Sequence, residues 1–115
     1  MTPDHINAVF ELGGSVFIWM NVRRLYRDKL VRGVYAPVVG FYTLWGFWNC
    51  YFYPAVGQTL SFYAGAAVTL GNLVWCALAV VYTRREQRAL AEAAKDEDHA
   101  RRWREGELDA ERYGR

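Results

Sequence analysis

The chain has 115 residues, 23% of them charged, and its 14 basic and 12 acidic residues leave a formal net charge of +2. With this near balance of charge we expect no nucleic-acid partner. The charges are unevenly placed, because residues 33–83 contain no Asp, Glu, Lys or Arg. An uncharged run of that length argues against an ordinary soluble domain, in which about a quarter of the residues are charged, and it predicts an integral membrane protein.

The pattern predicts an all-α fold class: a membrane protein with a bundle of three transmembrane helices and a charged cytoplasmic helical tail. A membrane helix needs about 20 mainly apolar residues to cross about 30 Å of hydrocarbon. The uncharged block suits two such helices, and a third candidate lies upstream. The predicted spans cover residues 6–23, 37–53 and 59–82 of a transmembrane domain at 1–83, and the tail covers 84–115.

The first predicted span has no Lys or Arg before Arg23, so we interpret it as a retained helix rather than a signal peptide. Its one acid, Glu11, lies near the outer end, in the headgroup layer or facing the other helices. Two adjacent glycines, Gly13 and Gly14, permit close packing, so this face should meet the other helices. Asn21, near the inner end, is a candidate cap, interhelical hydrogen-bond partner or gate residue.

The second predicted span begins near Pro37 and ends at Pro54. An aromatic stripe with spacings of four, three and four residues runs along it: Phe41, Trp45, Trp48 and Phe52. Tryptophan in the middle of a membrane is unusual, since it prefers the interfaces. The stripe fits either core packing or a stacking surface for a ring-shaped solute, and Asn49 would add an amide beside it.

The third predicted span carries a stripe of small or weakly polar residues at spacings of four, three, four and three: Gly65, Thr69, Asn72, Cys76 and Ala79. Such a stripe lets helices approach closely, at a dimer face for example, or lines a cavity. Asn72 is near the middle of the span, where an amide that faced lipid would have no partner. Two interpretations stay open: Asn72 bonds a neighbouring helix, or it binds a solute.

Orientation follows from the distribution of Lys and Arg. Five basic residues lie between positions 23 and 32, none lies in the second connection, and the third span is followed by Arg84, Arg85 and Arg88. Basic segments stay on the cytoplasmic side. We therefore expect a multi-pass protein of the cell membrane, with its N-terminus outside and its C-terminus in the cytoplasm. The tail holds nine basic and nine acidic residues and is predicted to be a solvated helix.

Sequence motifs of enzymes are missing. There is no Gly-rich phosphate loop, no nucleophile triad and no metal-ligand spacing. Cys50 and Cys76 both lie inside predicted spans and are expected to be small packing residues without a disulfide. We expect neither an enzyme nor a bound metal or cofactor.

The membrane block resembles the PQ-loop superfamily, in particular the bacterial SemiSWEET sugar transporters. The likeness covers about residues 6–85. Its elements are three helices with an external N-terminus, the Arg-Gly-Val-Tyr segment at 32–35, the Trp-rich stretch at 44–48, and an Asn in the third helix followed by an apolar run and a Tyr-plus-basic end.

The resemblance implies a triple-helix bundle that works as a homodimer and binds a small neutral solute, such as a sugar, for alternating access. The implied solute-binding residues are Asn72 and Trp48, with Trp45 second. The family's Pro-Gln pair falls on Met20 and Asn21, the implied inner gate, which lack the proline. Independently, three helices packed around one axis leave no room for a solute path, whereas two facing bundles do.

Two other interpretations are compatible with the sequence. The chain would be a small membrane interaction or structural subunit if the stripes are packing surfaces and the tail binds a cytoplasmic partner. A holin-like pore former is the third, less favoured because this tail is balanced in charge.

Overall fold

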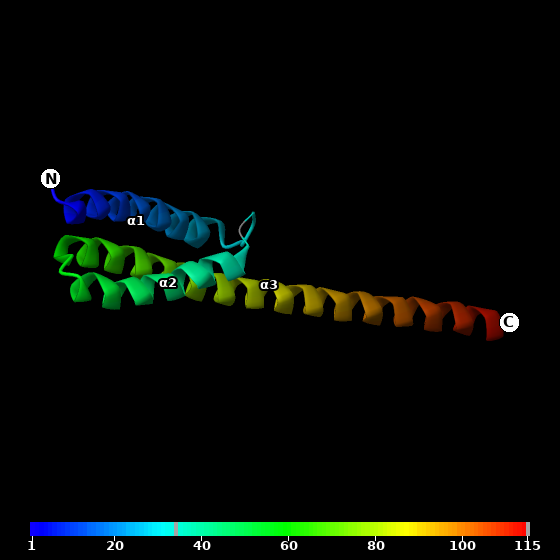
Figure 1. Cartoon of the computed structure of the whole chain (residues 1–115). Helices are drawn as coiled ribbons and strands as arrows, with labels where there is room; N and C mark the ends of the chain where they lie inside the picture. Colours follow the sequence, from blue (N-terminus) through cyan, green and yellow to red (C-terminus); the bar gives the residue numbers. More distant parts are fainter. Residues whose placement is uncertain (34, 115) are drawn as a thin grey trace. The chain divides into compact units, whose positions relative to one another are not determined.

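The computed structural model describes residues 1–33 and 35–114, and this part of the chain folds into three α-helices. In chain order they are α1 (Pro3–Asp28), α2 (Ala36–Ala55) and α3 (Thr59–Tyr113) (Figure 1). Two compact units divide the chain, unit 1 at Met1–Tyr82 and unit 2 at Thr83–Arg115. Val34 of the Arg-Gly-Val-Tyr segment and Arg115 at the end of the tail lie outside the described residues.

The all-α prediction is confirmed, but the prediction of a bundle of three transmembrane spans is wrong. Among the described residues, α3 is the one helix that is both long and apolar enough to cross a membrane. α1 falls short because it contains Glu11 and ends in a charged segment at 23–28. α2 is uncharged, but its Trp, Tyr and Asn side chains keep polar atoms that resist transfer into hydrocarbon.

The helix ends also differ from the expected ones. α1 continues through the basic segment to Asp28 and closes at Lys29, which has a left-handed φ of 53° and donates its N–H to the Leu25 carbonyl over 2.8 Å. α2 contains Pro54 and ends at Ala55. Gly57, which has a φ of +76°, then turns the chain towards α3. A proline removes one backbone hydrogen bond and its ring crowds the carbonyl four residues earlier, and α2 continues for only one residue beyond Pro54, to Ala55.

The start of α3 is capped by a residue from α1. The carboxylate of Asp4 accepts hydrogen bonds from the Leu60 and Ser61 backbone N–H groups, over 3.2 and 2.9 Å, and from the Ser61 hydroxyl over 2.6 Å. These N–H groups have no partner inside their own helix. The hydrogen bond from the Ser61 hydroxyl is the largest cause that lowers the pKa of Asp4. Asp4 therefore joins the first turns of α1 and α3.

Unit 1 packs its three helices side by side (Figure 1) around a small apolar core. The buried members of this core are Val22, Leu25, Trp75, Ala79 and Tyr82. Small residues bring the helices close together: a Cβ at Gly71 would lie 2.8 Å from Ile18 Cγ2 of α1, and one at Gly46 would lie 3.0 Å from Thr69 Cβ. Contacts this short leave room for hydrogen only.

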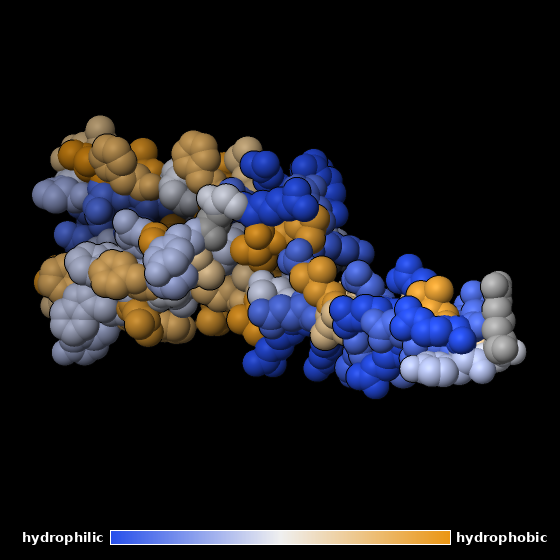
Figure 2. Space-filling model, turned by 90° about the vertical axis from the view of Figure 1, so that its right-hand side faces the viewer, coloured by the Kyte–Doolittle hydropathy of each residue, from blue (hydrophilic) through white to orange (hydrophobic). Residues whose placement is uncertain are grey.

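The two units have different surfaces. Unit 1 exposes large apolar and aromatic side chains, and most of its surface is orange or pale in Figure 2. The surface of unit 2 is mainly blue, and its ion pairs join Asp98 to Arg101 and Arg102 over 2.6 and 3.0 Å. An apolar surface of this extent is found where a protein meets lipid or another protein.

Candidate solute-binding groove

A groove of about 440 Å³ lies between the three helices of unit 1. This volume is within the usual range for small-molecule sites, about 300–1,000 Å³. Residues from all three helices line it: Glu11, Gly14, Phe17, Ile18 and Asn21 from α1, Val39, Tyr42, Trp45, Gly46 and Asn49 from α2, and Gly65, Val68, Thr69 and Asn72 from α3.

Three amide side chains enter this groove, one from each helix: Asn21, Asn49 and Asn72. Asn72 is only 7% exposed, and no hydrogen bond to its amide is formed within residues 1–33 and 35–114. In that described part of the chain, every fully enclosed polar side-chain atom has a hydrogen-bond partner. The unpaired amide of Asn72 is therefore open to the groove, where an amide offers both donors and an acceptor.

The floor of the groove is built by close packing of α2 and α3. Gly46 lies against the Thr69 side chain, and Thr69 donates its hydroxyl to the Gly65 carbonyl over 2.8 Å. This bond satisfies the buried hydroxyl within its own helix, and the same oxygen also lies 4.0 Å from the Cys50 thiol of α2. The small stripe of α3 thus serves as a packing surface and as part of the groove wall.

One carboxylate stands in the groove lining. Glu11 of α1 accepts a hydrogen bond from the hydroxyl of Tyr53, a residue of α2 that is 7% exposed. Both side chains lie against Gly65, where a Cβ would come within 3.0 Å of Tyr53 Cε2 and 3.8 Å of Glu11 Cδ. A larger residue at position 65 would displace this pair.

The two candidate tryptophans do not share one site. Trp45 lines the groove together with Asn72, whereas Trp48 is not among the lining residues. Trp48 is 56% exposed and stacks on Phe52, with ring centroids 6.5 Å apart and 20° between the planes. The structure therefore places Trp45, the second-ranked tryptophan of the sequence interpretation, in the groove with Asn72, and leaves the first-ranked Trp48 outside the groove.

The other predicted residues are spread between the groove, the packing contacts and the surface. A Cβ added at Gly14 would lie 3.8 Å from Val68 Cγ2, whereas a Cβ added at Gly13 would have no neighbouring atom within 4 Å. Cys76 lies 3.7 Å from the Thr43 hydroxyl, and Ala79 belongs to the core. Met20, one of the two predicted gate residues, is 60% exposed.

Several lining residues were not singled out from the sequence, including Ile18, Val39, Tyr42 and Val68. A signal for some of them was present. On α1 the lining positions 11, 14, 18 and 21 follow spacings of three, four and three, which is one helical face. Counting back from Asn21 in steps of three or four residues reaches Ile18, Gly14 and Glu11, which all lie on this face.

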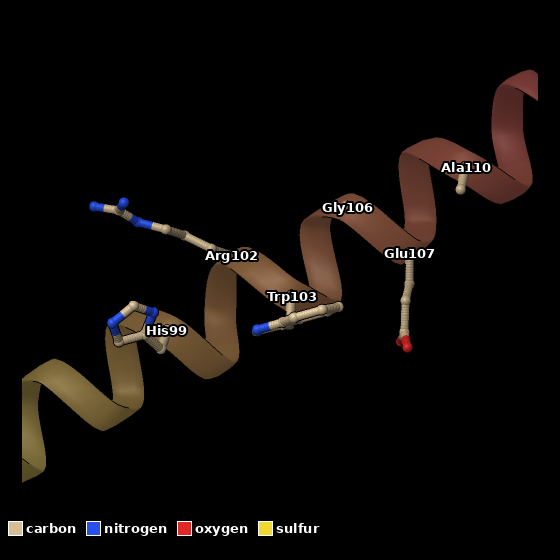
Figure 3. A pocket seen from close by; sticks show the side chains of 6 residues that line it. All are labelled: His99, Arg102, Trp103, Gly106, Glu107 and Ala110. Carbon is tan, nitrogen blue, oxygen red and sulfur yellow. The ribbon is translucent and has the colours of Figure 1, made fainter.

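A second hollow, of about 350 Å³, lies on unit 2 and is lined by His99, Arg102, Trp103, Gly106, Glu107 and Ala110. All six residues come from one stretch of α3 (Figure 3), and their spacings of three and one place them on one face of that helix. A ligand there would be held from one side only. The groove of unit 1, with walls from three helices, is the better candidate site.

The groove lining offers groups that can bind a polar molecule. Its lining offers amides, aromatic faces and one carboxylate, which are the groups that hold and orient a polar molecule. Within the described residues, no group of three or more His, Cys, Asp or Glu side chains is placed to hold a metal ion. Comparison of the chain with family models, curated proteins and solved structures finds no match.

Proposed function

We propose that this protein is membrane-associated and binds a small polar solute in the groove of unit 1, and that two copies together pass the solute across the membrane. The observation that carries the proposal is Asn72: the residue is only 7% exposed, its amide has no hydrogen-bond partner within residues 1–33 and 35–114, and it lines the groove. A solute that bonds this amide gains a hydrogen bond worth about 0.5–1.5 kcal/mol net.

Membrane association is supported by α3 and by the surface of unit 1. The apolar part of α3, from Thr59 to Tyr82, covers roughly 36 Å at about 1.5 Å per residue, enough for about 30 Å of hydrocarbon. Arg84, Arg85 and Arg88 follow it. On the proposed orientation this basic end and unit 2 lie on the cytoplasmic side.

The sequence resemblance to SemiSWEET transporters supports the homodimer. A stripe of exposed aromatic side chains on α2 gives the second copy a surface to meet: Phe41 is 60% exposed and Trp45 55%. Their rings stack with centroids 6.4 Å apart. The neutral solute implied by the sequence resemblance agrees with the uncharged middle of α2 and α3, but Glu11 of α1 also lines the groove and adds a negative charge to it.

A direct test is binding and uptake of a panel of polar solutes, namely glucose, sucrose, glycerol and 1,6-hexanediol, by the full chain in lipid vesicles. At least one member should bind and enter. Asn72→Ala should then weaken its binding about tenfold, the effect of one hydrogen bond of about 1.4 kcal/mol. Gln58→Ala, which removes an amide outside the groove, is the matched control and should leave binding unchanged.

If no member of the panel binds, or if Asn72→Ala binds as the unmodified chain does, the proposal is wrong.

The second candidate function is a membrane interaction subunit. It is favoured by two apolar side chains of unit 2 that are free to meet a partner, Leu90 at 65% exposure and Trp103 at 74%. Removing residues 90–115 should leave solute binding intact on the first proposal. Loss of a cytoplasmic partner without any solute binding would favour the second.

A further inference from the structure

We infer that the groove takes a small organic cation whose ammonium group pairs with the Glu11 carboxylate, an inference that rests on the solute-binding function proposed for the groove. The ammonium would supply the positive charge that the groove lacks. The rest of the ligand would reach the amide of Asn72.

The preference for a cation follows first from the charge of the groove lining. Glu11 is the one acidic residue among the lining residues, and no Lys, Arg or His belongs to them. The ion pairs in the described part of unit 1 involve Asp28 with Arg24 and Arg27, and Glu11 takes part in none. A groove lined by charge of one sign with low-dielectric walls raises the local concentration of the opposite charge. A cation is therefore favoured over a neutral molecule of the same shape.

The position of the carboxylate is fixed before any ligand arrives. The Tyr53 hydroxyl donates to Glu11 Oε1, and Gly65 provides the space in which the two side chains meet. An ionised carboxylate accepts about four hydrogen bonds, and Tyr53 supplies one of them. The remaining capacity suits an ammonium group, which carries up to three N–H donors. Holding the acceptor in place lowers the entropic cost of forming the pair.

The length of the ligand follows from the separation of Glu11 and Asn72. Glu11 lies beside Gly65, and Asn72 comes seven positions later on α3. At about 1.5 Å per residue this separation is roughly 10 Å along the helix. A molecule that meets both groups has an ammonium at one end and an uncharged hydrogen-bonding group at the other, joined by a short chain.

The test compares two probes that differ only in this charge: 6-amino-1-hexanol and 1,6-hexanediol. Calorimetric titration of the full chain in lipid nanodiscs should give at least tenfold tighter binding of the amine. Glu11→Gln should bring the ratio of the two affinities close to one without weakening the diol. Asp28→Asn, the same change at a carboxylate outside the groove, should keep the tenfold preference. Asn72→Ala should weaken both probes alike.

Each outcome decides one of the two proposals. Equal binding of amine and diol by the unmodified chain would overturn the cation inference and leave the solute-binding proposal intact. Binding of neither would overturn the cation inference, and the solute-binding proposal as well if glucose, sucrose and glycerol also fail to bind. Tyr53→Phe provides a second variant in case Glu11→Gln fails to fold, because it keeps the carboxylate and removes only the bond that holds it. It should retain most of the preference for the amine, and complete loss of that preference would contradict direct pairing with Glu11.

Discussion

The two parts of α3 share one backbone geometry and differ in everything that surrounds it. Every buried residue of this helix lies before position 83: Ser61, Gly65, Thr69, Gly71, Asn72, Trp75, Ala79 and Tyr82. The part in unit 2 is charged and almost wholly exposed. The first part is thus stabilised by tertiary packing. The second depends on helix propensity and on side-chain pairs one turn apart, each of which stabilises a helix by about 0.2–0.5 kcal/mol.

This difference teaches that the same residue type has opposite consequences in the two units. Gly46 and Trp75 of unit 1 are enclosed between helices. Gly106 and Trp103 of unit 2 face solvent and contribute mainly their intrinsic helix propensity. Paired substitutions in the two units therefore test the comparison directly.

The largest difference is expected for tryptophan. Trp75 is 4% exposed and belongs to the core of unit 1, whereas Trp103 is 74% exposed in unit 2. Trp75→Ala should destabilise unit 1 by about 3–5 kcal/mol, because it removes buried area and leaves a cavity. Trp103→Ala should change stability by less than about 0.5 kcal/mol. Chemical denaturation in detergent, followed by circular dichroism, measures both, and equal effects would show that the core is not where the structure places it.

Glycine substitutions should give a smaller effect with opposite signs. A Cβ at Gly46 would lie 3.0 Å from Thr69 Cβ, whereas one at Gly106 meets nothing within 4 Å. Gly46→Ala should cost about 1–3 kcal/mol through overpacking of α2 against α3. Gly106→Ala should stabilise the helix of unit 2 by about 0.5–1 kcal/mol. The same denaturation series reads both, and a stabilising Gly46→Ala would refute the close contact.

The smallest effect is expected for the cap that joins α1 to α3, and it depends on pH. Hydrogen bonds from Ser61 and Leu60 lower the pKa of Asp4 in the folded state. The stabilisation is therefore present above the unfolded pKa of about 3.9 and is lost as the pH falls through the lower folded value. Asp4→Ala should lower the melting temperature of unit 1 at pH 7, and this deficit should shrink below about pH 4.

Asp96→Ala, which removes a carboxylate of unit 2, is the control for this experiment and should leave the melting of unit 1 unchanged at pH 7. A melting-temperature deficit of Asp4→Ala that stays constant from pH 7 to pH 3 would contradict the assigned role of the ionised carboxylate.

Much of the candidate site followed from helical periodicity. The stripe of α3 placed Gly65, Thr69 and Asn72 on one face, and all three line the groove. Periodicity could not choose between Trp45 and Trp48, because the two are three positions apart and both lie on the aromatic stripe of α2. The choice depends on how α2 is rotated about its own axis. That rotation is set by contacts such as Gly46 against Thr69.

The prediction of three spans went wrong for a related reason. The prediction treats absence of charge as a measure of apolarity. α2 is uncharged, but its Trp and Tyr side chains and Asn49 leave it less apolar than a membrane span requires. The apolar part of α3 contains more Leu, Val and Ala, whose transfer into hydrocarbon needs no hydrogen-bond partner.

By itself, the sequence determined that the chain is helical, that residues 33–83 carry no charged side chain, and that Asn72 lies on a face of small residues. Only the tertiary structure decided that Asp4 caps α3, that Tyr53 bonds Glu11, and that Trp45 joins Asn72 in the groove. The physical reason is that propensity and periodicity act within one helix. The rotation and depth of each helix against its neighbours result from the packing of all three together.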